Sequence, residues 1–339
     1  MAVAGCGRGF PQKFQSKVWY VMKQEERFFN FLELAPRAEK PRKTGLTSIG
    51  DEGDPVSWVR DMLDIWGDYV DSVKFVPALL MMPNKIVEER VKLYRDYKLD
   101  VALDDPIFAI AYYQGKAEQL LRAAKDMGFT HCQIDTKNVR VDDPARERKA
   151  DEDAIRLAEL CDKLGLKTWG EVGQKHQDGD RARAGGGRLN VEAIVEDMKA
   201  LLAAGCEKVF LENRVMREAI GDYGEKSLGD QQLRDIISQV GVENIYIEIA
   251  NQMPFEARNC HRFWAVRTFG PDVNFAGGTT LKEVRYVEAI RRGIIFIPGP
   301  SKASSRLWVK SLAKNGGKAD AEWWTEPYPV DESLAAKLR

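Results

Sequence analysis

Carboxylate side chains recur along this chain of 339 residues at the ends of short runs that are rich in β-branched and aromatic residues. Glu171, Glu212 and Glu248 end three successive runs of this kind. Carboxylates that converge on one point repel one another, and a divalent cation or a basic side chain must neutralise them. A hard cation such as Mg²⁺ would polarise a substrate carboxylate there and stabilise an enolate-like intermediate. The three glutamates therefore predict a site for a metal or an acidic substrate.

Other polar residues follow the remaining runs in the same way. Lys74 lies between Val73 and Phe75, which predicts a buried strand. A lysine in a site of this kind acts as a general acid if burial or a cationic neighbour lowers its pKa. Glycines that precede a predicted helix can offer backbone N–H groups to an anion. The candidate substrate-binding residues are Lys74, Arg214, Asp51, Asp104, Asp135, Asn251, Asn274, Gly277 and Gly278. For any single acid the alternative is structural, as a helix cap or a partner for an arginine.

An alternation of strand-like and helix-like segments, which begins near residue 45, places these residues. The β-rich runs predict strands at Leu46–Asp51, Ser72–Val76, Asp100–Asp104, His131–Asp135, Lys167–Val172, Lys208–Glu212, Asn244–Ile249 and Asp272–Gly277. Amphipathic stretches predict helices at Pro55–Trp66, Lys85–Tyr97, Ala117–Met127, Asp151–Leu164, Val191–Ala204, Gln231–Val240, Phe255–Phe269 and Leu281–Arg292. Glycine is a common helix stop, and Gly128, Gly165, Gly205 and Gly241 stand where four of these helices end.

Strict alternation of strands and helices predicts a parallel sheet. Residues 45–293 have the usual length of a closed (β/α)8 barrel, whose active site lies at the C-terminal ends of the strands. The alternative is an open doubly wound sheet, which is disfavoured because no G-x-G-x-x-G follows the first strand. We therefore expect an α/β protein with a TIM-barrel catalytic domain.

Two segments fall outside the predicted barrel. Residues 1–44 form an N-terminal extension, which we expect to cap the bottom of the barrel. Residues 294–339 form a C-terminal extension with Trp308, Trp323 and Trp324. Because tryptophans rarely stay solvated, we expect this extension to pack on the barrel or on a neighbouring subunit of a homo-oligomer.

Composition excludes several other classes of protein. The 51 basic and 52 acidic residues give a net charge of −1, so no electrostatic footprint for nucleic acid or an anionic membrane is present. The five cysteines are odd in number and form no C-x-x-C pair, which argues against a zinc site or a disulfide framework and favours the reducing cytoplasm. We find no signal peptide and no apolar run that is long enough to span a membrane.

Several of these residues belong to longer motifs that occur in a fixed order. The motifs are KPRKTGLT at Lys40–Thr47 with Asp51 and Gly53 after it, GDYVDSVKF at Gly67–Phe75, EVGQK at Glu171–Lys175, ENR at Glu212–Arg214 and RRG at Arg291–Gly293. Together they resemble the phosphosulfolactate synthase family over roughly residues 30–295.

The resemblance implies a (β/α)8 barrel and a Mg²⁺-dependent lyase or synthase of carbon–sulfur bonds. The family's founding reaction is a Michael-type addition of sulfite to phosphoenolpyruvate through an enolate, which a lysine protonates. That lysine matches Lys175, and Glu171, Glu212 and Glu248 match the shell that holds the metal or the substrate. In a synthase or lyase of this kind, we expect Lys74 and Arg214 to bind the substrate carboxylate.

The chain departs from the family pattern after the second and third predicted strands. Bulky residues at Val76–Leu80 and acids at Asp104–Asp105 stand where the family has small residues. One alternative is therefore a diverged enzyme for a non-phosphorylated unsaturated acid or keto acid. Another is a non-catalytic barrel protein associated with heat stress, which the retention of Lys175 beside its carboxylates disfavours.

Overall fold

The computed structural model describes residues 28–136, 144–173, 182–185, 188–224, 227–295 and 306–326. The chain divides into two compact units at Glu33 and Leu34. Within the first unit, the described residues 28–33 form a turn in which the Leu32 amide donates to the Phe29 carbonyl at 2.8 Å. The second unit holds the remaining elements.

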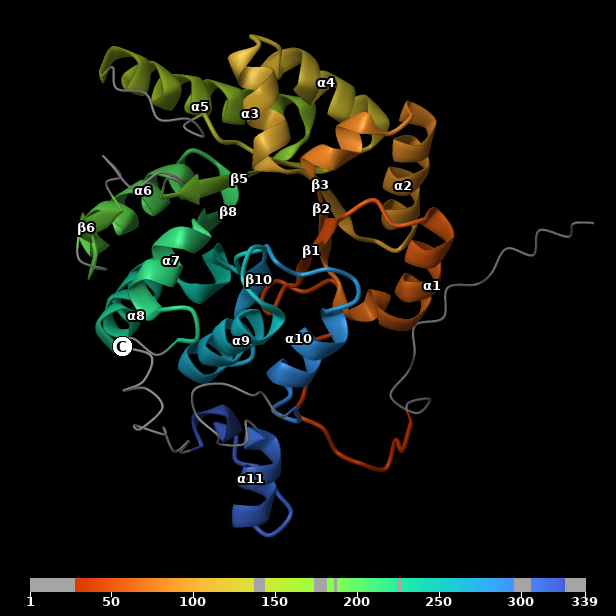
Figure 1. Ribbon diagram of the computed structural model, residues 1–339, viewed down its shortest axis with the longest axis vertical. Coiled ribbons are helices and arrows are strands. Elements are labelled where there is room, and N and C mark those ends of the chain that lie inside the picture. The colour runs from red at the N-terminus through yellow and green to blue at the C-terminus, as the bar shows by residue number, and fades with distance from the viewer. Residues whose placement is uncertain are drawn as a thin grey trace, which may run out of the picture. The chain divides into compact units, whose positions relative to one another are not determined.

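The second unit is built on a sheet of eight parallel strands (Figure 1). In order around the sheet they are β1 (Ser48–Asp51), β2 (Ser72–Phe75), β3 (Asp100–Leu103), β4 (His131–Gln133), β5 (Lys167–Val172), β8 (Cys206–Leu211), β9 (Ile245–Glu248) and β10 (Asn274–Ala276). A parallel bridge between Thr47 and Phe275 joins the first and last strands. The predicted (β/α)8 barrel is therefore confirmed.

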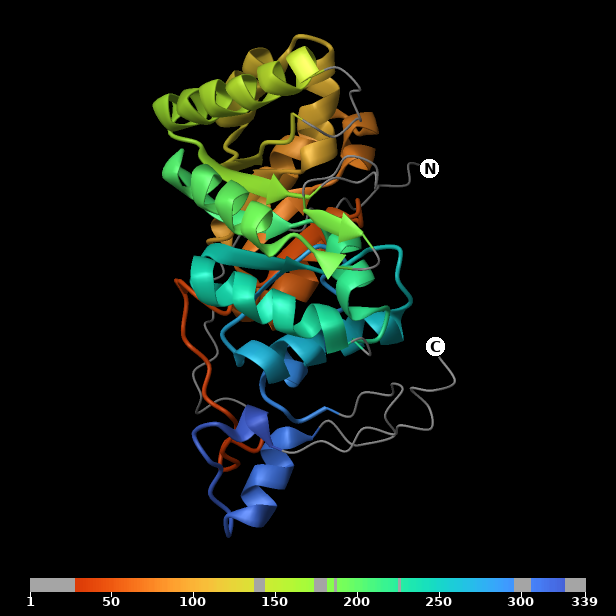
Figure 2. The ribbon, with the colours of Figure 1, turned by 90° about the vertical axis from the view of Figure 1, so that its left-hand side faces the viewer.

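Helices follow the strands and cover the outside of the barrel. They are α1 (Val56–Trp66), α2 (Asn84–Asp96), α3 (Asp105–Tyr113), α4 (Ala117–Met127), α5 (Pro144–Leu164), α6 (Val191–Ala203), α7 (Asn213–Ile220), α8 (Ser227–Val240), α9 (Phe255–Phe269) and α10 (Val284–Arg291). Figure 2 shows α6 and α8 side by side on this outer layer. None of the helices in the described ranges is long and apolar enough to cross a membrane.

A short antiparallel pair, β6 (Arg183–Gly185) and β7 (Arg188–Leu189), lies between β5 and α6 in the chain. Gln232 on α8 holds β7 by two bonds, since its amide donates to the Leu189 carbonyl at 2.8 Å and accepts from the Leu189 amide at 3.0 Å. This ribbon therefore packs on the outer helices.

Side chains of alternate strand residues fill the barrel interior, because successive residues of a strand point to opposite faces. An apolar cluster forms its floor and consists of Ala102, Trp169, Phe210, Tyr246 and Ala276. The rings of Phe210 and Tyr246 stack with their centroids 4.9 Å apart. Two residues further along these strands, on the same face, come Asp104, Glu171, Glu212, Glu248 and Gly278. The alternation thus places acids above an apolar floor, at the C-terminal ends of the strands.

The motifs near the two ends of the barrel domain close its amino-terminal side. Arg42 donates to the Asp71 carboxylate at 2.9 Å, which ties the segment before β1 to the segment before β2. Arg291 is buried and donates to the carbonyls of Val273 at 2.6 Å and Leu46 at 2.8 Å. These arginines satisfy backbone groups where the last strand meets the first, and their role is structural.

Asn274 takes part in the same closure. It is the first residue of β10 and is fully buried; its amide donates to the Ile245 carbonyl at 3.0 Å, and its oxygen accepts from the Leu46 amide at 3.0 Å. We expected Asn274 to bind substrate, but its side chain joins strand ends on the side of the barrel opposite to the acids.

The described part of the C-terminal extension packs on the barrel. It contains α11 (Leu307–Lys314) and a 3₁₀ turn at Trp323–Thr325. Leu307, Trp308 and Trp323 belong to the same apolar core as residues of β8 and β9, and the two indole rings meet edge to face at 5.8 Å. Burial of two tryptophans is a large apolar contribution to the stability of this contact.

Candidate active site

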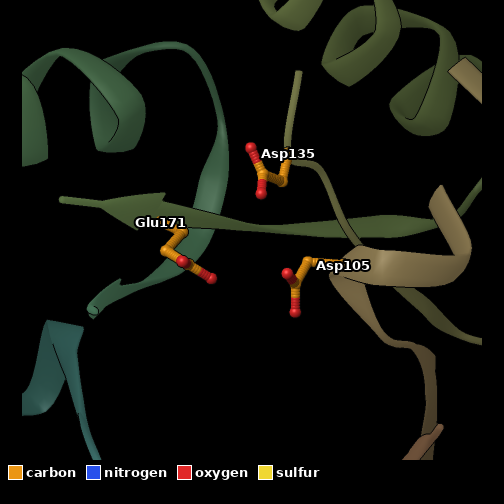
Figure 3. A group of neighbouring side chains, drawn as sticks. All are labelled: Asp105, Asp135 and Glu171. Atoms are coloured by element: carbon orange, nitrogen blue, oxygen red, sulfur yellow. The ribbon is translucent and has the colours of Figure 1, made fainter. Parts of the chain in front are cut away.

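Three carboxylates meet at the C-terminal side of the barrel (Figure 3). Asp105 is the first residue of α3, Asp135 follows β4 by two residues, and Glu171 lies near the end of β5. One oxygen of each lies within 4.8 Å of the other two. Asp105 is buried, so water cannot stabilise its negative charge and nearby polar or positive groups must do so.

Lys74 on β2 is a buried cation beside this cluster. Its ammonium lies 2.8 Å from Asp104 and 3.9 Å from Glu248, and 5.2 Å above the ring of Phe210. Burial alone would lower the pKa of Lys74, but the charges of Asp104, Glu248 and Asp105 outweigh it and raise that pKa. Lys74 therefore stays protonated at neutral pH, which suits it to bind an anion rather than to donate a proton.

Gln133 on β4 connects Lys74 to the carboxylate cluster. It is fully buried; its oxygen accepts from the Lys74 ammonium at 3.0 Å, and its amide nitrogen donates to Glu171 at 2.6 Å. The expected site residues Lys74, Asp104, Asp135 and Glu171 are thus brought together by the fold.

Glu248 and Glu212, which we predicted as metal ligands with Glu171, have other described partners. Glu248 accepts from the backbone and side-chain amides of Asn213 at 3.2 and 3.3 Å. Glu212 caps α7 by accepting from the Arg214 amide at 2.8 Å. In the described structure only Glu171 of the three belongs to the cluster of three carboxylates. Glu248 instead faces the Lys74 ammonium, at 3.9 Å. Arg214, which we expected to bind substrate, is exposed.

Asp51 at the end of β1 is held by α2. Both of its oxygens accept from Arg90, at 2.5 and 2.9 Å, and Tyr94 donates to it at 2.9 Å. All three side chains are buried. Asp51, which we expected to bind substrate, is therefore engaged in attaching α2 to the barrel, as the structural alternative anticipated.

The loop after β10 is fixed from outside the barrel. Arg262 on α9 is fully buried and donates to the Gly278 carbonyl at 2.7 Å and to Glu283 at 2.6 Å. The Gly278 amide, one of the predicted anion donors, donates to the Asn251 side chain. Gly277 has φ +63°, and a Cβ there would lie 2.6 Å from the Ile249 carbonyl, so the site requires glycine.

Lys175, the predicted proton donor, lies outside the described residues. The last described residue before it is Gly173, which directly follows β5 and has φ +98°.

Two residues of the site were absent from the predicted set. Asp105 follows the end of β3 by two positions and begins α3; from the sequence it was noted only as a departure from the family pattern, and Asp104 alone was expected in the site. Gln133 lies two residues before Asp135, so the two side chains point to the same face of the chain. Because Asp135 was expected to face the barrel interior, this spacing could have predicted that Gln133 faces it too.

The chain is similar in sequence to one known family and to several of its members. The sequence profile of the family described as (2R)-phospho-3-sulfolactate synthase (ComA) matches residues 35–296. Phosphosulfolactate synthase from Methanothermobacter thermautotrophicus is 28% identical over 268 residues, which are 78% of this chain and 95% of that protein. Phosphosulfolactate synthase from Bacillus subtilis is 27% identical over 264 residues, with 78% and 95% covered. Among solved structures, orotidine 5′-phosphate decarboxylase from Pyrococcus horikoshii matches 73% of this chain and 100% of its own at 12% identity and a TM-score of 0.42.

Proposed function

This chain belongs to the (2R)-phospho-3-sulfolactate synthase family, and we propose that it adds sulfite to phosphoenolpyruvate or to a closely related unsaturated acid. The observation that carries the proposal is the buried Lys74, which is protonated at neutral pH, beside three converging carboxylates at the C-terminal side of the barrel. A small acidic substrate needs such a cation. The carboxylate cluster needs a second cation to neutralise it.

The reaction forms one carbon–sulfur bond and breaks none of the substrate's single bonds. The sulfur lone pair of sulfite attacks the methylene carbon, and the electron pair of the double bond moves toward the substrate carboxylate. A proton is then added to the central carbon. The site must therefore bind the carboxylate, stabilise the added negative charge and deliver one proton.

Lys74 would bind the substrate carboxylate from the floor of the site, and Arg214 would approach it from the rim. Because its pKa is raised, Lys74 keeps its charge when the substrate gains negative charge. Lys175 would deliver the proton. Glu248 orients Lys74, and Glu212 fixes the start of α7 beside the site.

Asp105, Asp135 and Glu171 would hold Mg²⁺ when it is bound. Their donors are the hard oxygens that Mg²⁺ prefers; two ligands at ~2.1 Å from one ion lie ~3 Å apart when adjacent and ~4.2 Å apart when opposite. Oxygens within 4.8 Å of one another need only a small contraction to fit. Mg²⁺ bound there would supply positive charge to the substrate carboxylate.

A second candidate is a non-phosphorylated unsaturated or keto acid. It is favoured by the segment after β2, where Leu79 and Leu80 lie in a 3₁₀ turn, and by Asp105 after β3. Neither bulky apolar groups nor a carboxylate favours a phosphate. A barrel protein without catalysis is the third reading.

The test is an assay with phosphoenolpyruvate, sulfite and Mg²⁺, followed by mass spectrometry of the products. A sulfonate adduct that disappears in Lys175→Ala, with unchanged circular dichroism, supports the proposal. Folded wild-type protein that forms no sulfonate rejects the founding reaction. A panel of non-phosphorylated enoic acids with sulfite then tests the second candidate, and no turnover with any of them leaves the non-catalytic reading.

A further inference from the structure

We propose that Gln133 is a positioning residue that holds Lys74 and Glu171 in one fixed arrangement and keeps their charges apart. The inference rests on the proposed function, since it concerns the same site. Gln133 is 0% exposed and lies on β4, between the strands that carry the two charged residues. Its two bonds, 3.0 Å to Lys74 and 2.6 Å to Glu171, use both ends of the amide.

The two partners determine which way the amide points. A lysine ammonium has only donors, and an ionised carboxylate has only acceptors. The Gln133 oxygen must therefore face Lys74 and its nitrogen must face Glu171. Both bonds are charge-assisted, which makes them stronger than bonds between neutral groups.

A neutral connection matters because Lys74 is otherwise surrounded by acids. Lys74 pairs with Asp104 at 2.8 Å and faces Glu248 at 3.9 Å. Glu171 belongs to the cluster with Asp105 and Asp135. A direct ion pair between Lys74 and Glu171 would remove a carboxylate oxygen from that cluster and turn the cation away from the substrate. Gln133 separates Lys74 from the three carboxylates that would hold the metal.

The strand neighbours leave room for this connection. Ala102 on β3 is the register partner of Lys74 and belongs to the barrel floor. Its methyl group is small, so the long stem of Lys74 can pass over β3 toward Gln133. A larger side chain at position 102 would occupy the same interior space.

Mn²⁺ is the probe for the functional test, because its binding to the full chain can be titrated by electron paramagnetic resonance without substrate. Gln133→Leu should weaken Mn²⁺ binding about tenfold, since Glu171 loses its donor and pairs directly with Lys74. The control is Gln232→Leu, which also removes two amide bonds, but those that join α8 to β7. It should bind Mn²⁺ like the wild type.

In the sulfite addition assay, Gln133→Leu should lower kcat more than it raises KM. Wild-type affinity in Gln133→Leu would overturn the positioning role.

A double-mutant cycle with Lys74→Met, measured by urea unfolding without metal, tests the arrangement independently of any activity. Non-additive effects are expected, and additive ones would show that Gln133 does not hold Lys74. If the wild type binds no Mn²⁺, the metal part of the proposed function is rejected, and this cycle alone decides the inference.

Discussion

Replacement of Lys74 by methionine should destabilise the folded chain strongly. The substitution keeps most of the side-chain volume and removes the charge. Asp104, at 2.8 Å, and Glu248, at 3.9 Å, would then face each other without a cation. At an effective dielectric constant of about 20, the two attractions are ~6 and ~4 kcal/mol before the cost of desolvation is subtracted. Loss of one partner from a buried ion pair costs ~3–5 kcal/mol of unfolding free energy, and we expect a value in this range.

The control is Lys92→Met on the outer face of α2. Lys92 lies 2.9 Å from Asp96, nearly the same distance as in the buried pair, but its side chain is 75% exposed. Exposed pairs of this kind contribute less than ~0.5 kcal/mol. Urea unfolding followed by circular dichroism, with EDTA present, measures both variants. A cost below ~1 kcal/mol for Lys74→Met would refute the reasoning, because a buried cation between two carboxylates cannot be removed so cheaply.

The pH dependence of the same comparison follows from the raised pKa of Lys74. A folded-state pKa above the ordinary 10.5 means that the stabilisation is fully present below pH 10.5 and is lost only as the pH rises through the higher folded-state value. The difference between wild type and Lys74→Met should therefore be constant from pH 7 to about 10. In acid it should shrink, because protonated carboxylates no longer need the cation.

Three further predictions concern groups away from the site. Asp51→Asn should cost ~3–5 kcal/mol in urea unfolding, because it leaves Arg90 buried without its anion; a neutral effect would contradict the attachment of α2. Burial alone would raise the pKa of Glu207, but its bonds with His131 and Lys167 outweigh burial and lower that pKa from 4.5 to about 2. The ionised Glu207 therefore stabilises the fold above pH 4.5, and this contribution is lost as the pH falls toward 2. Glu207→Gln should flatten the acid limb of thermal unfolding there, and an unchanged limb would count against this pairing. Burial lowers the pKa of Lys40 from 10.5 to about 8. Between pH 8 and 10.5 the unfolded chain therefore binds more protons than the folded chain, and the free energy of unfolding should rise with pH. Lys40→Met should remove this rise, and a rise of the same size in the variant would assign it to other groups.

Much of the fold could be predicted because its local signals agree. The run Lys167–Val172 and the helices Ala117–Met127 and Phe255–Phe269 have the observed bounds. Glycine at the helix ends explains part of this agreement, since Gly128 has φ +99° and only glycine adopts such a value freely.

Two short helices were missed for different reasons. The sequence of α3, DPIFAIAYY, is apolar on nearly every face and has no amphipathic period, so it reads as a buried run. The eight residues of α7 follow β8 directly, and the Glu212 side chain that starts the helix was assigned to the metal instead. A carboxylate at a strand end serves equally well as an N-cap, and only the three-dimensional arrangement separates these roles.

The site was predicted to the level of the strand ends and no further. Glu171, Asp104 and Lys74 are inward-facing residues near the ends of their strands or just beyond them, and they do lie close to one another. Asp51 stands at a strand end too, but Arg90 comes from a helix 39 positions later and occupies it. Pairings over such separations depend on tertiary packing, which single strands and helices do not encode.

The raised pKa of Lys74 bears on which residue binds negative charge and which residue donates the proton. A general acid is effective when its pKa lies near the working pH, because it must release the proton in the transition state. Lys74, held by Asp104 and Glu248, releases its proton reluctantly and is suited to hold negative charge in place. The proton would then come from a different group, and the proposed function gives this role to Lys175 because it matches the lysine of the family. Lys74→Met should therefore raise KM for the acidic substrate, whereas Lys175→Ala should abolish kcat with little change in substrate binding.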